Sequence, residues 1–313
     1  MSMQVIIVDD VHPILIDGLL AENCIVDYLP EATEVEILAV IQNYDGIVVR
    51  SKLQLNEKVL SQAAKLKWIA RAGSGMDNVD VEYAAKNNIV CINAAEANAD
   101  SVGEHTVGML LTLLHKLNQA DRQVRSGIWD REGNRGIELS NKTLGIVGFG
   151  HTGKSVARKL SGFGCKIWVY DKYLENYGTS YAKPCEMEQI FETCNIITFH
   201  VPHTSETLKM VNETYLNQFK KPVFLLNLSR GKVINTKDLV KCLESGKVLG
   251  CALDVLENEN IGTLNEEELI WFNYLTHSKR TLLAPHVGGW SKESYQKISE
   301  VLLLKIKELK NKI

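Results

Sequence analysis

The sequence lacks any apolar run of roughly 18 residues, the length that a membrane-spanning helix needs. Its N-terminus, MSMQVIIVDD, has neither a basic segment nor a small-residue cleavage site, so we expect no signal peptide. No excess of one charge is present, since Lys plus Arg number 35, Asp plus Glu number 38, and the net charge is −3. This balance gives no electrostatic reason to expect nucleic acid or an anionic membrane as a partner.

A CxxC pair is also missing. The chain has seven scattered cysteines, at Cys24, Cys91, Cys165, Cys185, Cys194, Cys242 and Cys251. Cysteines without paired spacing are typical of reduced thiols in a cytosolic protein and offer no structural zinc site. We therefore predict a cytoplasmic protein that binds no metal.

Repeats and low-complexity tracts are absent as well, and short β-like runs alternate with helical patterns along the 313 residues. The predicted strands are 4–8, 46–50, 68–71, 90–92, 143–147, 166–170, 196–200, 224–228, 250–253 and 281–283. This alternation predicts an α/β protein with doubly wound parallel sheets, and the length allows two domains.

Residues 143–171 form the most informative segment. An apolar strand runs into GFGHTG, a helical pattern follows, and a second strand ends on Asp171. Gly148 permits a tight turn, Gly150 lets the backbone approach a pyrophosphate, and Gly153 lets the helix pack close to the strand. Asp171 can accept hydrogen bonds from a ribose diol, and its charge disfavours a 2′-phosphate. We therefore predict an NAD-binding βαβ unit.

The late start of this unit indicates a separate domain before it. Residues 101–126 predict a helix that leads from the first domain into the second. Residues 292–313 predict an amphipathic helix that can return to the first domain, with one apolar face formed by Ile298, Val301, Leu302, Ile306 and Leu309. An alternative for the N-terminus is a phosphoacceptor receiver domain, which residues 3–20 resemble. A receiver needs an Asp at the end of its third strand, whereas the predicted strand 46–50 ends in Arg50.

Three side chains with catalytic chemistry follow predicted strands, at the sheet edge where open α/β sheets bind ligands. The guanidinium of Arg230 can hold a carboxylate with two hydrogen bonds and polarise the adjacent carbonyl. The imidazole of His286 can exchange a proton near neutral pH, and Glu259 would orient it. The set suits hydride transfer on a 2-hydroxy or 2-oxo acid. The alternatives without catalysis are that Arg230 only forms a salt bridge and that His286 is an ordinary loop residue.

The chain resembles the D-isomer-specific 2-hydroxyacid dehydrogenase family over nearly its whole length, and within it the phosphoglycerate dehydrogenase subgroup. The matching stretches are KTLGIVGFGHTGKSVA, FHVPHTSET, LLNLSRGKVINTKDLV, GCALDVLENE and APHVGG. The resemblance places Arg230, Glu259 and His286 on the family's catalytic positions. It implies two Rossmann-like domains, a discontinuous substrate domain (1–97 and 287–313) and an inserted NAD-binding domain (98–286).

The resemblance also implies the ligand contacts. The cofactor would contact Gly148, Gly150, His151, Thr152, Gly153, Asp171, His200, Val201, Pro202, Thr207, Leu228, Ser229, Asp254 and Gly288. The substrate would contact Arg50, Ser51, Ser74, Gly75 and Asn98. Gly73 and Gly75 could also free backbone N–H groups for an anion nest.

The chain departs from the family pattern at three places. His151-Thr152 replaces the usual Arg-Ile, with little expected loss because phosphate contacts there are mostly to backbone. Asn260 stands where Pro is usual and would loosen the loop of Glu259. Trp290 replaces a smaller residue, either to shape the substrate pocket or to anchor the last helix. The chain ends without the regulatory domain of some phosphoglycerate dehydrogenases, so we expect no control through such a domain.

These observations predict an NAD-dependent oxidoreductase that acts on a D-2-hydroxy acid, with 3-phospho-D-glycerate of serine biosynthesis as the favoured substrate. Glyoxylate, hydroxypyruvate and D-lactate type substrates are alternatives within the family. An NAD(H)-sensing, corepressor-like protein is the non-enzymatic alternative. A methyltransferase would leave Arg230 and His286 without a role. We also expect a homodimer.

Overall fold

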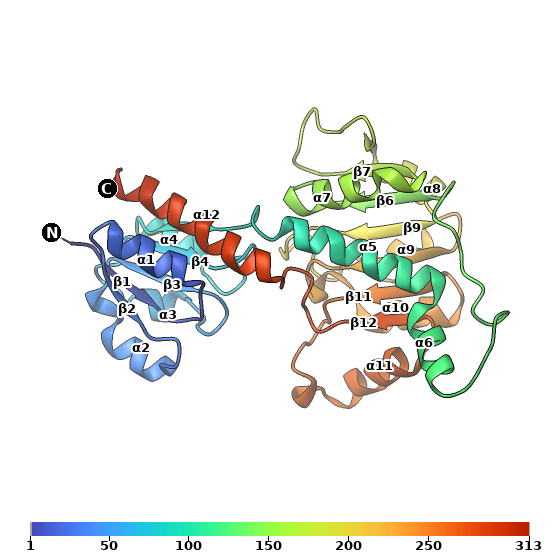
Figure 1. Ribbon diagram of the computed structural model, residues 1–313, viewed down its shortest axis with the longest axis horizontal. Helices are drawn as coiled ribbons and strands as arrows, with labels where there is room; N and C mark the ends of the chain where they lie inside the picture. Colours follow the sequence, from blue (N-terminus) through green and yellow to red (C-terminus); the bar gives the residue numbers. More distant parts are fainter. Residues whose placement is uncertain (1, 313) are drawn as a thin grey trace. The chain divides into compact units, whose positions relative to one another are not determined.

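The computed structural model describes residues 2–312 and divides the chain into two compact units, each an alternation of strands and helices (Figure 1). The first unit comprises Met1–Ala99 and Trp290–Ile313, and the second comprises Asp100–Gly289. The sequence predicts these two boundaries after residues 97 and 286, which is two and three residues before the boundaries in the structure. An α/β architecture with one unit inserted into the other is confirmed.

The first unit is built on a five-stranded parallel sheet. Its strands in spatial order are β2 (Ile25–Tyr28), β1 (Gln4–Ile7), β3 (Gly46–Val49), β4 (Trp68–Arg71) and β5 (Val90–Asn93). Its helices are α1 (Pro13–Ala21), α2 (Glu34–Val40), α3 (Glu57–Leu60), α4 (Val81–Lys86), α12 (Lys292–Lys310) and the 3₁₀ turn η1 (Ile41–Asn43). Along β1, Ile6 belongs to one buried cluster and Ile7 to another, so helices cover both faces of the sheet.

Helix α12 lies beside α1 in the first unit (Figure 1). Its predicted apolar face packs there, with Ile298, Leu302 and Ile306 buried. The helix was expected to reach Ile313, which lies outside the described residues. The return of the last helix to the first unit is therefore confirmed.

The order β2-β1-β3-β4-β5 reverses between β1 and β3. In open α/β sheets, ligands bind beyond the carboxyl ends of the strands at such a reversal. Asp9 lies just beyond the end of β1, and Arg50 follows β3 directly. The reversal therefore brings Arg50 to the expected ligand-binding edge, and an arginine stands where a receiver domain would need its aspartate.

The second unit is built on a seven-stranded parallel sheet. Its strands in spatial order are β12 (Thr281–Leu283), β11 (Val248–Leu253), β10 (Val223–Asn227), β9 (Ile196–Phe199), β6 (Thr143–Val147), β7 (Lys166–Tyr170) and β8 (Lys183–Pro184). Its helices are α5 (Ala99–His115), α6 (Leu117–Arg125), α7 (His151–Leu160), α8 (Met187–Thr193), α9 (Glu213–Asn217), α10 (Thr236–Glu244) and α11 (Glu266–His277), with 3₁₀ turns η2 (Ser161–Phe163), η3 (Gly231–Val233) and η4 (Ile261–Thr263). The strand order reverses between β6 and β9. This reversal puts the glycine-rich turn after β6 next to the end of β9.

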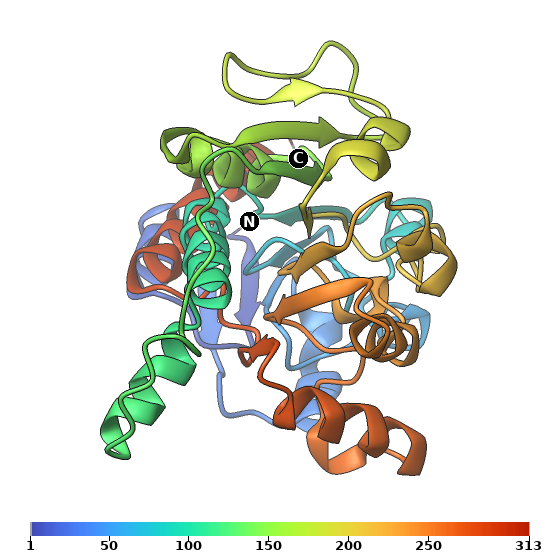
Figure 2. The ribbon, with the colours of Figure 1, turned by 90° about the vertical axis from the view of Figure 1, so that its right-hand side faces the viewer.

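Two edge strands and one helix break were not predicted. Strand β2 is largely exposed and β8 is only two residues long, so neither carries a strong apolar signal. The predicted helix 101–126 is interrupted by Lys116, which is left-handed with a φ of 53°. The reason is tertiary, because the Leu114 carbonyl accepts the Ile137 N–H at 3.0 Å instead of continuing the helix. Helix α6 consequently projects away from the seven-stranded sheet (Figure 2).

The close approach of α7 to the turn before it should make Gly153→Ala destabilising. A Cβ at Gly153 would lie 2.1 Å from the Gly148 carbonyl oxygen, a backbone atom that has little freedom to move. Overpacking of this kind costs about 1–3 kcal/mol, which urea unfolding would measure. Gly108→Ala is the matched control, because its Cβ would meet no described atom within 4 Å and alanine favours the helix. Equal stability of the two variants would contradict the packing argument.

Candidate active site

The turn after β6 is a glycine-rich cradle with open space beside the start of α7. Gly148 has a φ of 92°, and a Cβ there would lie 2.5 Å from the His200 carbonyl oxygen. Gly150 is the N-cap of α7 and supplies no side-chain hydrogen bond, and a Cβ on it would meet no described atom within 4 Å. The first N–H groups of α7 thus lack a side-chain cap, and the space beside them is open. Because free N–H groups at a helix N-terminus bind phosphate, this turn fits the pyrophosphate of a dinucleotide.

The carboxylate of Asp171 lies against the same turn. It accepts the N–H groups of Phe149 at 2.7 Å, Tyr173 at 3.0 Å and Leu174 at 3.2 Å. The adjacent Lys172 ammonium is paired with Glu206 at 2.7 Å. Negative charge therefore predominates beside the end of β7, which suits a ribose diol better than a second phosphate.

The loops after β9 and β10 carry the other residues expected around a cofactor. Burial lowers the pKa of His200 to about 3, so its ring is neutral, and Nε2 lies 3.0 Å from Thr198 Oγ1. Thr207 closes its loop by donating to the Pro202 carbonyl at 2.7 Å. Ser229 is buried with Leu228, and its hydroxyl donates to Asn227 Oδ1 at 2.8 Å. Val201, in the loop after β9, is half-buried; at the start of α7, Thr152 is half-buried and His151 is exposed.

Glu259 and His286 form the pair expected of a proton-transfer site. Nδ1 of His286 lies 3.0 Å from Oε2 of Glu259, and each side chain is 46% exposed. A cavity of about 420 Å³ adjoins them, lined also by Asp254, Phe272 and Leu283. The pair thus borders open space within the second unit.

His286 is held in an unusual backbone conformation. Its φ is 56°, which is uncommon for a residue other than glycine. Its N–H donates to the Asp254 carbonyl at 2.7 Å. The Asp254 carboxylate then accepts the next two N–H groups, from Val287 at 2.9 Å and Gly288 at 2.8 Å. One residue thus fixes three successive peptide groups of the histidine loop.

Asp254 is only 2% exposed. Burial raises the pKa of Asp254, but the His105 ring 3.5 Å away and the Val287 and Gly288 N–H groups outweigh burial and lower that pKa below its ordinary value. The carboxylate is therefore ionised at neutral pH. The sequence suggested a cofactor contact for Asp254, and in the structure both of its oxygens hold the loop of His286.

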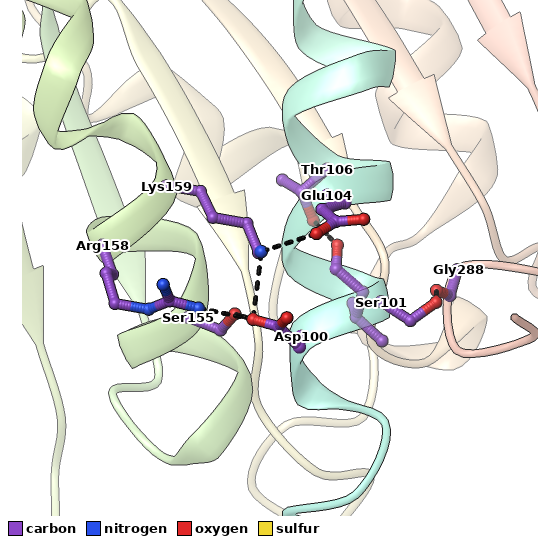
Figure 3. A network of polar contacts seen from close by, with 9 residues as sticks. Asp100, Ser101, Glu104, Thr106, Ser155, Arg158, Lys159 and Gly288 are labelled. Atoms are coloured by element: carbon purple, nitrogen blue, oxygen red, sulfur yellow. Dashed lines mark hydrogen bonds and ion pairs between the residues drawn. The ribbon is translucent and has the colours of Figure 1, made fainter. Parts of the chain in front are cut away.

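The start of helix α5 ties this loop to the dinucleotide cradle (Figure 3). The Ser101 hydroxyl donates to the Gly288 carbonyl at 2.7 Å. One residue earlier, Asp100 pairs with Arg158 at 2.5 Å and Lys159 at 3.0 Å, both on α7. The same helical turn thus fixes the histidine loop and the helix of the phosphate cradle.

Arg230 follows β10 and is half-buried. Its Nη1 donates to the Ser229 carbonyl at 2.7 Å, and its own carbonyl accepts Asn227 Nδ2 at 2.9 Å. A Cβ on Gly231 would lie 1.7 Å from the Leu256 carbonyl oxygen, so the Arg230 segment packs directly on the chain that leads to Glu259. The guanidinium is not among the groups that line the cavity beside His286.

The residues expected to bind substrate lie in the first unit. The Arg50 N–H donates to Asp9 at 2.6 Å, and Ser51 is exposed. Within residues 2–312, the N–H groups of Ser74 and Gly75 donate to no other group, as an anion nest requires. The N–H group of Gly73 was also expected to be open to an anion. It instead donates to the Arg71 carbonyl at 2.8 Å. Asn98 has a buried Oδ1 that finds no hydrogen-bond partner in the same range.

Sequence reasoning missed several residues that support these sites. His105 contacts Asp254, and the Arg71 guanidinium occupies the space where a Gly73 side chain would lie. Glu257 accepts the Thr236 N–H at 3.0 Å and pairs with Lys209 at 2.6 Å, which anchors the chain just before Glu259. The contacts of His105 and Glu257 join positions far apart in the sequence, so no local pattern could have revealed them.

The geometry agrees with comparisons to known proteins. Residues 107–288 match the D-isomer specific 2-hydroxyacid dehydrogenase, NAD binding domain. The chain belongs to this family. It is 32% identical to D-3-phosphoglycerate dehydrogenase of Synechocystis over 293 residues, which cover 93% of this chain and 51% of that protein. It is 35% identical to D-3-phosphoglycerate dehydrogenase of Bacillus subtilis over 256 residues, which cover 81% of this chain and 47% of that protein. The chain therefore spans about half the length of these relatives.

The family fold is also found in a crystal structure of D-lactate dehydrogenase from Aquifex aeolicus, complexed with NAD and lactic acid. The match has a TM-score of 0.85 at 24% identity and covers 98% of this chain and 95% of that chain. No helix within residues 2–312 is long and apolar enough to cross a membrane. Over the same range, no group of three His, Cys, Asp or Glu side chains is arranged to hold a metal ion.

Asp254→Asn should destabilise the protein by about 1–3 kcal/mol at neutral pH, because an amide leaves one buried N–H group unsatisfied. The pKa of Asp254 is lower in the folded protein, so its contribution is present above the unfolded value of about 4 and is lost as pH falls through the folded value. Urea unfolding at pH 7 and pH 3 should therefore show a smaller difference between variant and wild type in acid. The exposed Asp121→Asn is the control and should change stability by less than about 0.5 kcal/mol. A difference that does not depend on pH would exclude the charge of Asp254 as its source.

Proposed function

We propose that this chain is an NAD-dependent dehydrogenase of D-2-hydroxy acids, with 3-phospho-D-glycerate as substrate. The observation that carries the proposal is the Glu259–His286 pair, whose 3.0 Å contact lies on a loop fixed by a buried carboxylate. The Synechocystis and Bacillus relatives are named D-3-phosphoglycerate dehydrogenases, which favours this substrate. Glyoxylate, hydroxypyruvate and D-lactate type acids are the alternatives that the experiment below separates.

NAD held by the second unit would supply the hydride acceptor for oxidation at C2 of the hydroxy acid and, in its reduced form, the hydride donor for the 2-oxo acid. Glu259 holds Nδ1 of His286, which leaves Nε2 to take the hydroxyl proton during oxidation and to return it during reduction. The positive charge that then forms on the imidazole is stabilised by the same carboxylate. Arg230 binds the substrate carboxylate and polarises the neighbouring carbonyl. Asp254 keeps the histidine backbone in place throughout.

We assign the cofactor to the second unit. The turn of Gly148, Gly150 and Gly153, with His151 and Thr152 at the start of α7, would hold the pyrophosphate. Asp171 would hold the adenosine ribose, and its charge selects NAD over NADP. The remaining proposed contacts come from the loops after β9, β10, β11 and β12, namely His200, Val201, Pro202, Thr207, Leu228, Ser229, Asp254 and Gly288.

We assign the remaining substrate contacts to the first unit, through Arg50, Ser51, Ser74, Gly75 and Asn98. The free N–H groups of Ser74 and Gly75 suit a carboxylate, and Arg50 suits a second anionic group. A homodimer, a cytoplasmic location and a role in serine biosynthesis stay predictions.

The test is a panel of 2-oxo acids with NADH as the reductant. We expect the highest kcat/KM with phosphohydroxypyruvate, followed by hydroxypyruvate, glyoxylate and pyruvate. His286→Ala should lower kcat by about 10²–10⁴ because general acid–base catalysis is lost, while NADH binding measured by fluorescence is retained. A preference for pyruvate or glyoxylate would replace the proposed substrate. NADH binding without turnover of any acid would favour the corepressor-like alternative.

Replacing Asp171 tests the cofactor assignment. Asp171→Ser should weaken NAD binding about tenfold to a hundredfold, since hydrogen bonds to a charged acceptor are lost, and should narrow the preference over NADP. Asp171→Asn is the matched variant, because it keeps an acceptor for the glycine-rich turn while removing the charge. The ratio of NAD to NADP affinity in each variant gives the result. An unchanged ratio in both would mean that Asp171 serves only the turn.

A further inference from the structure

Arg50 and Trp290 form a stacked pair in the first unit. The guanidinium carbon of Arg50 lies 3.5 Å from the centre of the Trp290 ring. Both residues belong to the first unit although 240 positions separate them in the chain. A cation at this distance from an indole face is in favourable cation–π contact.

The pair is supported at the reversal point of the five-stranded sheet. Asp9, which is buried, accepts the Arg50 N–H at 2.6 Å. Its neighbour Asp10 accepts the hydroxyl groups of Tyr28 at 3.1 Å and Tyr295 at 2.9 Å. Tyr295 lies in the first turns of α12, whose N-cap Ser291 directly follows Trp290. The backbone of Arg50 and the helix that follows Trp290 are thus both fixed to the end of β1.

The stacking leaves the hydrogen-bonding capacity of Arg50 intact. A guanidinium donates its hydrogen bonds in its own plane, whereas the indole covers one face. Within residues 2–312, the structure records no hydrogen bond or ion pair from the Arg50 guanidinium. Trp290 therefore contacts one face of the side chain, while the N–H groups in the guanidinium plane are of the kind that bind planar or tetrahedral oxyanions.

Trp290 itself is poorly suited to a role as a packing anchor, because 58% of its surface is exposed. The buried contacts of α12 are made instead by Ile298, Leu302 and Ile306. The indole instead contacts the Arg50 guanidinium.

We propose that Trp290 is a positioning residue for substrate specificity, which orients Arg50 to bind the distal phosphate of a phosphorylated 2-hydroxy acid. The proposal rests on the proposed function, because it concerns how that substrate is distinguished from its unphosphorylated analogue. It predicts that removing the indole weakens recognition of the phosphate and leaves recognition of the reacting end nearly intact.

The experiment measures KM and kcat with NADH for phosphohydroxypyruvate and hydroxypyruvate, which differ only in the phosphate. Trp290→Ala should raise KM for phosphohydroxypyruvate about threefold to thirtyfold, the range expected for a lost cation–π contact, with a much smaller change for hydroxypyruvate. Trp290→Phe keeps an aromatic face and should restore most of the loss. Arg50→Ala should raise KM for the phosphorylated acid about tenfold to a hundredfold, and adding Trp290→Ala to it should cost little more.

Two control variants complete the design. Trp129→Ala removes an indole that is 80% exposed in the second unit and should leave the ratio of the two KM values unchanged. Arg230→Ala should impair both substrates alike, since both carry the carboxylate and the reacting carbonyl. Thermal unfolding of each variant identifies any loss of the folded protein.

The outcomes separate the inference from the proposed function. If wild type prefers phosphohydroxypyruvate and Arg50→Ala removes that preference while folded Trp290→Ala keeps it, the role of Trp290 is wrong and the proposed function stands. Additive losses in the double variant would also overturn it, because they would show that the two residues act separately. If wild type shows no preference for the phosphorylated acid, the phosphoglycerate assignment and the inference both fail.

Discussion

The buried carboxylate of Asp254 is the constraint on which the rest of the site depends. A carboxylate that is 2% exposed is costly unless every oxygen is satisfied, and here the acceptors are matched to two successive N–H groups. That match forces the chain after β12 into one path, with His286 at a φ of 56°. An energetic cost in the backbone of the proposed catalytic histidine is thus offset by hydrogen bonds one and two residues later.

The glycine-rich turn after β6 is likewise held by closely matched backbone contacts. Gly148, Gly150 and Gly153 remove three Cβ atoms, two of which would collide with backbone oxygen atoms, and the third would fill open space at the start of α7. Asp171 then closes the turn by accepting the Phe149 N–H. Because Asp100 and Ser101 lie in one turn of α5, the cradle and the histidine loop are fixed to the same support (Figure 3). Rigid support of this kind keeps the groups of a site in a fixed geometry without reorganisation during the reaction.

The first unit uses a different device. The groups that we propose for anion binding there are the backbone N–H groups of Ser74 and Gly75 and the Arg50 guanidinium, which stacks on the Trp290 indole. A long flexible arginine loses considerable side-chain entropy when it binds a ligand. Stacking on Trp290 removes part of that freedom before any ligand arrives, which is a general route to tighter and more selective binding.

The sequence by itself determined the periodic elements and the residues that local chemistry singles out. Strands such as β6 and β9, apolar on both faces, could be predicted because each residue signals burial, and the glycine spacing with Asp171 predicted the dinucleotide turn. Arg230, Glu259 and His286 were found because each follows a strand. Only the tertiary structure decided the edge strands β2 and β8, the break at Lys116, and the contacts of Asp254 with Gly288 and of Arg50 with Trp290. The physical reason is that these features arise from partners distant in the chain, whose approach depends on how the whole unit packs and not on the local pattern.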